Sequence, residues 1–157
     1  IYCRPLLKFI NMKARINIEQ VEPKAYEAMY ALEKYLQQAG IDKGHLELIK
    51  LRASQINGCA FCIDMHSKDA LKQGETAQRI FLLNAWKETD LYSAEERVIL
   101  EMTEEITLIH KNGLSESLYF KAEQLFDSNY IAQVIMAIAT INAWNRIAIS
   151  TTRKVTK

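Results

Sequence analysis

Two cysteines and a histidine form the most reactive group of residues in the chain. They are Cys59, Cys62 and His66, in the segment CAFCIDMH. On a helix with about 100° per residue, Cys62 lies about 60° from Cys59, and His66 falls between them. Two neighbouring thiols beside an imidazole are typical of a redox-active dithiol or of part of a metal site.

The surroundings of both thiols favour the reactive thiolate form. A cysteine with an ordinary pKa of about 8.5 is only about 3% ionised at pH 7. Cys59 follows Gly58 and is expected in the first turn of a helix, where backbone amides and the helix dipole stabilise negative charge. His66 follows Cys62 by four residues, so it can exchange a proton with that thiol or pair with it as imidazolium. The helix position alone favours Cys59 as the more acidic thiol.

A carboxylate is expected to join this group through a helical hairpin. Asn57-Gly58 predicts a break between two antiparallel helices. Glu47 precedes Gly58 by eleven residues and His66 follows it by eight, which places them about 16 Å and about 12 Å from the turn. If both face inward, they lie about one helical turn apart. The sequence therefore predicts a relay from Glu47 through His66 to Cys62, with Cys59 placed to close a disulfide.

Helical periodicity runs through the remainder of the chain, and no segment alternates like a strand. We expect a single all-α domain of about seven helices. Pro23 suits a first helical turn, Thr76 and Ser115 are candidate caps, and Ser93 with Glu96 forms a capping-box pattern. The seven expected helices are marked by residues 25–36, 46–56, 59–73, 76–86, 93–109, 115–125 and 129–151.

The composition excludes several classes of protein. The chain has 157 residues, with 20 Lys and Arg against 19 Asp and Glu, which gives a net charge of +1. This balance argues against a broad basic surface for nucleic acid. Three cysteines are too few for a secreted disulfide framework. We therefore expect a protein of the reducing cytoplasm, where a CxxC pair is catalytic or metal-binding.

The two ends of the chain need separate interpretation. Residues 1–11 have no initiating Met and no pattern of a signal peptide, so we interpret them as an N-terminal extension or cloning remnant. The domain is then residues 12–157. The apolar helix at 129–151 is interrupted by Gln133, Asn142, Asn145 and Arg146. We expect it to be buried or to lie in a subunit interface rather than to span a membrane. Asn142, Asn145 and Arg146 need buried partners across helices or subunits.

The arrangement of Glu47, eleven residues, Cys59-x-x-Cys62, three residues and His66 resembles the signature of the alkylhydroperoxidase D (AhpD-like) core. That core belongs to the carboxymuconolactone decarboxylase family. The segments LRASQINGCAFCIDMHSKDALKQGET and AIATINAWNRIAIS also resemble single-domain members, and the likeness covers residues 13–153.

The resemblance implies an all-α, oligomeric fold (dimer, trimer or hexamer) and reduction of organic hydroperoxides. By that analogy, Cys62 attacks the peroxide and becomes a sulfenic acid, and Cys59 resolves it to a disulfide. A lipoyl or thioredoxin-like dithiol protein then restores the thiols. No flavin, nucleotide or metal motif accompanies the dithiol, so no cofactor is expected. Phe61 stands where the better-known peroxidase members carry histidine, which predicts weaker peroxidase activity.

Other functions stay open from the sequence. One is a non-peroxidatic lyase of the same fold, similar to carboxymuconolactone decarboxylase, which would not need the dithiol. Another is a redox-sensing or zinc-binding dithiol module. Zinc would need a fourth ligand from His45, Glu47 or His110. We interpret His45 and His110 instead as structural or solvent-facing, because neither shares a face with the dithiol.

Overall fold

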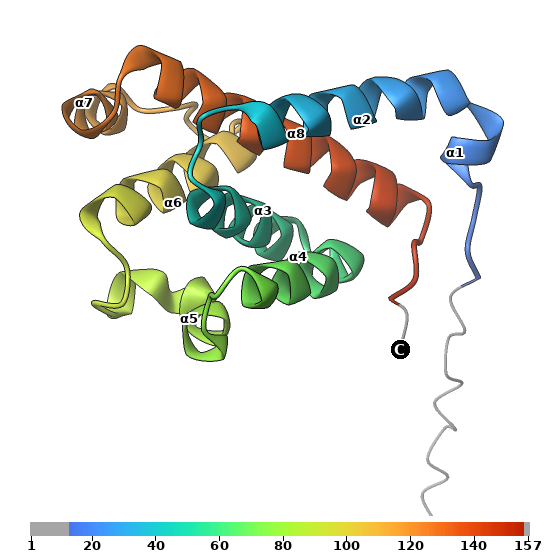
Figure 1. Cartoon of the computed structure of the whole chain (residues 1–157), viewed down its shortest axis with the longest axis horizontal. Helices are drawn as coiled ribbons and strands as arrows, with labels where there is room; N and C mark the ends of the chain where they lie inside the picture. Colours follow the sequence, from blue (N-terminus) through green and yellow to red (C-terminus); the bar gives the residue numbers. More distant parts are fainter. Residues whose placement is uncertain (1–12, 156–157) are drawn as a thin grey trace, which may run out of the picture.

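The computed structural model describes residues 13–155, and the expected extension at residues 1–11 lies outside them. Within the described range the chain forms eight α-helices and one 3₁₀-helix, and it forms no strand (Figure 1). These are α1 (Ile18–Val21), α2 (Pro23–Gln38), α3 (Lys43–Asn57), α4 (Ala60–Lys72), α5 (Ala77–Leu82), η1 (Leu83–Glu88), α6 (Ala94–Thr107), α7 (Glu116–Leu125) and α8 (Ser128–Ser150). The all-α prediction is confirmed. The additional helix is α1, whose four residues are too few to show a helical period.

Three of the expected helix starts have the geometry that their residues predict. Pro23 occupies the first turn of α2, where its missing N–H is not needed. The hydroxyl of Thr76 accepts a hydrogen bond from the backbone N–H of Arg79 at the start of α5. Ser93 and Glu96 form both hydrogen bonds of a capping box at the start of α6. These local signals therefore set where α2, α5 and α6 begin.

The expected side-chain cap at Ser115 is wrong, and α6 is shorter than predicted. Ser115 is the residue before α7, but its hydroxyl accepts no hydrogen bond from a backbone N–H of the helix. It donates to Oε1 of Glu105 at 3.1 Å and accepts from the hydroxyl of Ser117 at 3.4 Å. Its backbone N–H donates to Oε2 of the same carboxylate at 2.7 Å. Helix α6 ends at Thr107, so Ile109 lies beyond it and is exposed. A carboxylate from a neighbouring helix has taken the hydrogen bonds that a local pattern assigned to α7.

The break between α3 and α4 is the turn that the sequence predicts. Gly58 has φ 69° and ψ 31°, a left-handed conformation that glycine adopts without steric cost. Its backbone N–H donates to the carbonyl of Gln55, and the N–H of Cys59 donates to the carbonyl of Ser54 at 3.0 Å. Figure 1 shows α3 and α4 side by side and antiparallel after this turn.

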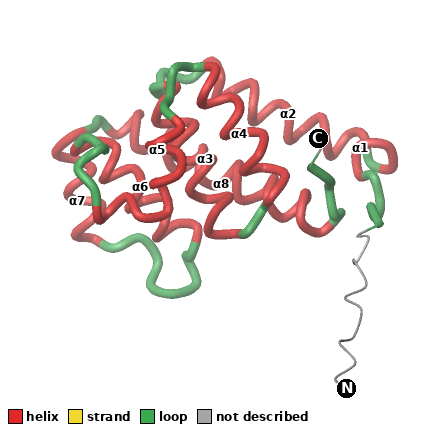
Figure 2. Tube along the Cα trace, turned by 90° about the horizontal axis from the view of Figure 1, so that it is seen from below, coloured by secondary structure: helices red, strands yellow, loops and turns green. Residues whose placement is uncertain are grey.

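Helix α3 lies at the centre of the fold, in contact with α4, α6 and α8. Its residues Ile49, Leu51 and Ala53 are fully buried, which shows that it is covered on several sides. Helix α8 packs along α3, and α2 contacts α8 from the same side as α3 (Figures 1 and 2). No helix among residues 13–155 is long and apolar enough to cross a membrane.

Polar residues of α8 connect it to the end of α3. The side-chain amide of Asn57 donates to Oδ1 of both Asn142 and Asn145, each at 2.9 Å. Asn145 in turn donates to the hydroxyl of Ser54 at 3.0 Å, in a fully buried position. The prediction of partners across helices is thus confirmed for Asn142 and Asn145. Within the chain Arg146 has no such partner among the described residues: it is exposed and donates to Asn142 of its own helix, and a partner in another subunit stays a prediction.

The chain that follows α8 is tied to the chain that precedes α1. The N–H of Arg15 donates to the carbonyl of Thr151 at 3.1 Å, and the hydroxyl of Thr152 donates to the carbonyl of Lys13 at 3.0 Å. Both segments lie at the same end of the molecule (Figure 2). This attachment holds residues 151–153 beside the N-terminal end of α4 and the start of α2.

Candidate active site

Glu47 and His66 meet across the α3–α4 hairpin. Nδ1 of His66 lies 3.2 Å from Oε2 of Glu47, and the two residues are only 5% and 7% exposed. If Nδ1 carries the proton that is shared with the carboxylate, Nε2 is left as the free basic nitrogen. The contact predicted from helical rise is therefore present, and in this tautomer Nε2 is the nitrogen that can exchange a proton with another group.

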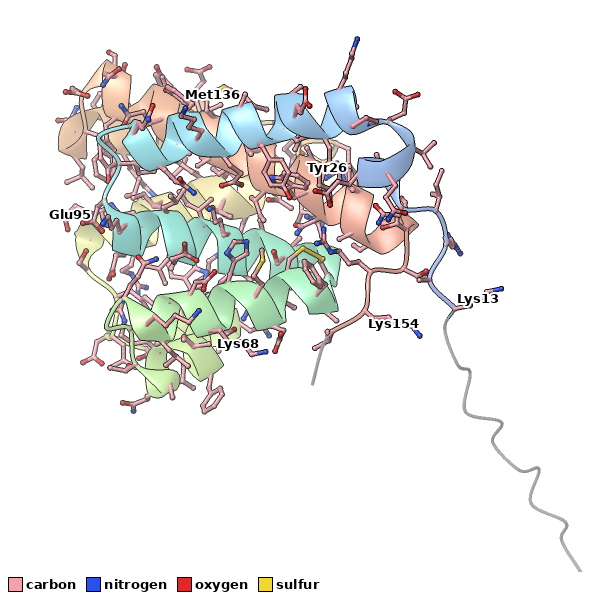
Figure 3. The ribbon with its side chains drawn as sticks, turned by 45° about the vertical axis from the view of Figure 1, so that its right-hand side comes forward. Lys13, Tyr26, Lys68, Glu95, Met136 and Lys154 are labelled. Atoms are coloured by element: carbon pink, nitrogen blue, oxygen red, sulfur yellow. A yellow bond between two sulfur atoms is a disulfide. The ribbon has the colours of Figure 1, made fainter. Side chains whose placement is uncertain are left out.

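Cys59 and Cys62 are joined by a disulfide at the N-terminal end of α4, drawn as a yellow bond in Figure 3. Their Cα atoms are 5.4 Å apart. Cys59 is the residue before the helix rather than part of its first turn, and its Sγ accepts a hydrogen bond from the N–H of Cys62 at 3.4 Å. Both residues are buried, among Ala148 of α8 and the ring of Phe61.

A cavity of about 290 Å³ opens beside the disulfide between α2, α3, α4 and α8. Cys62 and His66 both line it, whereas Cys59 does not. The cavity gives a ligand a route to Cys62 and to the imidazole of His66, whereas Cys59 lies outside the cavity lining. This arrangement favours Cys62 as the thiol that meets a substrate, which is the role that the resemblance implies. It does not favour Cys59, which the helix position alone indicated as the more acidic thiol.

Two ionisable residues in the cavity wall were missed by the sequence reasoning. Nζ of Lys50 lies 3.0 Å from Oε2 of Glu33, and both side chains are largely buried. The spacing could have predicted Lys50, because it follows Glu47 by three residues on α3 and so lies on the same face of the helix. No local signal existed for Glu33, which reaches the site from α2.

Tyr30 and Arg153 also line the cavity without any signal in the local sequence. Burial and the negative charge of Glu19 raise the pKa of Tyr30, which is therefore a protonated phenol at neutral pH. Nη1 of Arg153 donates to the hydroxyl of Tyr26 at 2.7 Å, and its guanidinium carbon lies 4.4 Å from the centre of the Phe61 ring. These residues come to the dithiol from α2 and from the segment after α8.

The other two histidines lie away from the dithiol. Nδ1 of His45 is 2.6 Å from the hydroxyl of Tyr130, near the start of α3, and His110 is exposed after α6. Both have the structural or solvent-facing positions that were predicted. Among residues 13–155, no three His, Cys, Asp or Glu side chains are grouped so that they could hold a metal ion.

Sequence comparison identifies relatives over most of the chain. The family model described as "Carboxymuconolactone decarboxylase family" matches residues 23–105, which include Glu47, both site cysteines and His66. The uncharacterised protein YdfG of Bacillus subtilis (strain 168) is 45% identical over 139 residues, which cover 88% of this chain and 95% of YdfG.

Solved structures show the same arrangement of helices. The crystal structure of ATU0492 from Agrobacterium tumefaciens has a TM-score of 0.90 and 38% identity, over 92% of this chain and 99% of that one. ATU0492 is a protein of unknown function with a suggested role as the antioxidant defence protein AhpD. The debrominase Bmp8 shares the fold at a TM-score of 0.77 and 16% identity, over 87% of this chain and 74% of Bmp8. The family match and the extent of these similarities show that the chain belongs to the carboxymuconolactone decarboxylase family, with an AhpD-like fold.

Proposed function

We propose that this protein reduces organic hydroperoxides through a dithiol–disulfide cycle of Cys62 and Cys59. The observation that carries the proposal is that Cys62 and His66 line one cavity, while the carboxylate of Glu47 contacts Nδ1 of the imidazole. The disulfide between Cys59 and Cys62 is the oxidised state of this cycle. The suggested antioxidant role of ATU0492, which is 38% identical, supports the same class of reaction.

In the first step the thiolate of Cys62 attacks the terminal oxygen of the hydroperoxide. The O–O bond breaks, Cys62 becomes a sulfenic acid, and the alkoxide leaves as an alcohol after it takes a proton. His66 is placed to remove the thiol proton and to return it to the leaving oxygen, with Glu47 stabilising the charged imidazolium. No further acid or base is needed for this step.

In the second step Cys59 closes the cycle. Its thiolate attacks Sγ of Cys62, the sulfenic oxygen leaves as water with one added proton, and the disulfide forms. A dithiol protein of the lipoyl or thioredoxin type then supplies two electrons and two protons to restore both thiols. Because this reductant must itself be kept reduced, we place the protein in the cytoplasm.

Exposed aromatic side chains support a homo-oligomer. Phe81 on α5 and Phe120 on α7 are 79% and 63% exposed, and contact with another subunit would remove such apolar side chains from water. We propose that a second copy of the chain covers at least one of these side chains. Size-exclusion chromatography with light scattering tests this, and a monomer at micromolar concentration would contradict it.

A titration of thiols tests the peroxidase directly. The Cys3→Ser variant leaves two thiols, so the count reports only on Cys59 and Cys62. The reduced protein is mixed with one equivalent of cumene hydroperoxide, and both thiols are expected to disappear within seconds to minutes. In Cys59→Ser a sulfenic acid should be trapped on Cys62, whereas Cys62→Ser should keep its thiol.

Two outcomes would reject the proposal. Thiols that persist for hours at neutral pH would remove the peroxidase step. A sulfenic acid on Cys59 in the Cys62→Ser variant, but none in Cys59→Ser, would reverse the assigned roles. The same samples are assayed for bound zinc, and a variant with both Cys59→Ser and Cys62→Ser is assayed for lyase activity. Bound zinc or surviving lyase activity would favour the other functions that the sequence left open.

A further inference from the structure

The cavity beside Cys62 combines an apolar wall with one charged side chain at its edge. The apolar part is formed by Phe61, Met65, Ile141, Trp144 and Ile147. Its volume of about 290 Å³ is at the lower end of the range of about 300–1,000 Å³ for small-molecule pockets. The wall therefore suits a compact hydrocarbon such as a substituted ring or a short branched chain.

Each charged side chain that lines the cavity, except one, has an oppositely charged partner within ion-pair distance. Lys50 pairs with Glu33 at 3.0 Å, and Asp69 pairs with Lys72 at 3.0 Å. Arg153 makes no ion pair with any carboxylate of the part of the chain that the structure describes. Glu19 lines an adjoining pocket together with Arg153 but forms no ion pair with it. A guanidinium stays protonated at all ordinary pH values, so Arg153 gives the cavity one positive charge that is not held in an ion pair.

This guanidinium is held in a fixed place beside the dithiol. The hydroxyl of Tyr26 accepts a hydrogen bond from Nη1, and the ring of Phe61, the residue before Cys62, lies below the guanidinium plane. The backbone of Arg153 is fixed as well, because its N–H donates to the carbonyl of Ala148 at 3.0 Å. A positioned guanidinium with unused N–H groups is well suited to bind a carboxylate through two hydrogen bonds.

The positions of these residues define an axis through the cavity. Arg153 is exposed, whereas Cys62 and His66 are buried. A ligand with a carboxylate at one end can therefore keep that group at Arg153, partly in water, while its apolar body extends past Phe61 toward the thiol. A neutral ligand of the same shape would gain only the apolar contacts.

We propose that the cavity selects organic hydroperoxides that carry a carboxylate, and that Arg153 binds this carboxylate. The inference rests on the proposed function and specifies its substrate class. Arg153 acts on the remote end of the substrate, so its contribution depends on the charge of the substrate and not on the O–O bond.

Two hydroperoxides with the same frame test this specificity. Cumene hydroperoxide is neutral, and its 4-carboxy derivative carries one negative charge at the far side of the ring. The second-order rate constant of thiol oxidation is measured for both with the reduced protein. Arg153→Met is expected to lower the rate constant for the carboxylated substrate about tenfold and to leave that for cumene hydroperoxide within twofold.

Two further variants separate recognition from general effects of charge or packing. Lys154→Met removes a neighbouring positive charge that does not line the cavity and whose side chain points away from the helices (Figure 3), so both rate constants should stay unchanged. Tyr26→Phe removes the hydroxyl that orients the guanidinium, and a smaller loss is expected for the carboxylated substrate alone. Equal losses for both substrates in Arg153→Met would overturn the inference, as would no loss for either.

A binding measurement keeps the inference separate from the peroxidase proposal. 4-Isopropylbenzoate has the carboxylate and ring but no peroxide, so it can be titrated into the oxidised protein by NMR. Its Kd is expected to rise about tenfold in Arg153→Met and to stay unchanged in Lys154→Met. Binding that depends on Arg153 in a protein that oxidises no hydroperoxide would reject the peroxidase and keep the anion site. If both peroxides are reduced at rates that do not depend on Arg153, the peroxidase is kept and the carboxylate site is rejected.

Discussion

Nδ1 of His66 lies 3.2 Å from Oε2 of Glu47, although nineteen residues separate them in the sequence. The α3–α4 hairpin brings them together, because a left-handed residue at Gly58 reverses the chain within one turn. The pair is buried, so the carboxylate acts on the imidazole with little screening by water. In the cycle that we propose, proton transfer at Cys62 therefore depends on a residue that does not line the cavity at the thiol.

Glu47→Gln tests this dependence. The amide has the shape of the carboxylate, but it cannot stabilise an imidazolium by charge. We expect the rate constant of Cys62 oxidation by cumene hydroperoxide to fall about tenfold to hundredfold, since general acid–base assistance is reduced. Stopped-flow measurement of thiol loss gives the rate, and Glu123→Gln on the exposed face of α7 is the matched control. Losses in Glu47→Gln and His66→Gln that multiply in the double variant would show that the two residues act independently.

Gly58→Ala tests the turn itself. Alanine at φ 69° is strained, and we expect the free energy of unfolding to decrease by about 1–2 kcal/mol. Gly40→Ala is the control, because a Cβ there would meet only ordinary contacts with Gln133 at 3.9 Å. Urea titration measures both variants. A larger loss in Gly40→Ala than in Gly58→Ala would contradict this account of the hairpin.

Asn145→Ala tests the polar contacts between α3 and α8. The substitution leaves the hydroxyl of Ser54 without the amide donor and Asn57 with one acceptor fewer, in a buried position. We expect a loss of about 2 kcal/mol of stability, measured by urea unfolding. Asn112→Ala, in the exposed segment after α6, should change stability by less than about 0.5 kcal/mol. An equal effect of the two substitutions would show that the buried amide contributes nothing.

Acid should weaken the contact of α6 with α3 and η1 through Glu104. Burial opposes the charge of Glu104, but hydrogen bonds from Lys87, Trp86 and Arg52 outweigh it and lower the pKa of the carboxyl below its ordinary value of 4.5. The pKa is lower in the folded state, so this stabilisation is present above pH 4.5 and is lost as the pH falls through the folded value.

Glu104→Gln measures that contribution. Because the carboxylate is partly exposed, we expect the variant to lose about 1 kcal/mol of stability at pH 7 and progressively less toward pH 3. The difference between wild type and variant is followed by urea unfolding at several pH values. A difference that grows as the pH falls would contradict the assigned direction of the pKa.

The parts of the site that were predictable from the sequence lie close together along the chain or around one turn. Cys59, Cys62 and His66 are within one helical segment, and a count of residues on each side of Gly58 places Glu47 correctly. Such inferences use only helical rise and one chain reversal. The roles of these residues in catalysis stay predictions, which the thiol experiments test.

The parts that were not predictable depend on how distant helices pack. Glu33 and Tyr30 come from α2, and Arg153 follows α8, more than ninety residues after Cys59. Their approach to Cys62 is set by the packing of α2 and α8 against the hairpin. The failed cap at Ser115 has the same cause, because its hydroxyl meets a carboxylate of α6 rather than the first turn of its own helix.

The hydrogen bonds of Asn57 also bear on how the protein ages chemically. Asparagine before glycine is prone to deamidation, in which the following backbone nitrogen attacks the side-chain amide carbon. Here the N–H of Gly58 is bonded to the carbonyl of Gln55, and the amide of Asn57 is held by two acceptors from α8. Both reacting groups are restrained in the native fold. Loss of ammonia from this dipeptide should therefore follow unfolding, and the resulting carboxylate would face two amide oxygens next to the turn that precedes Cys59.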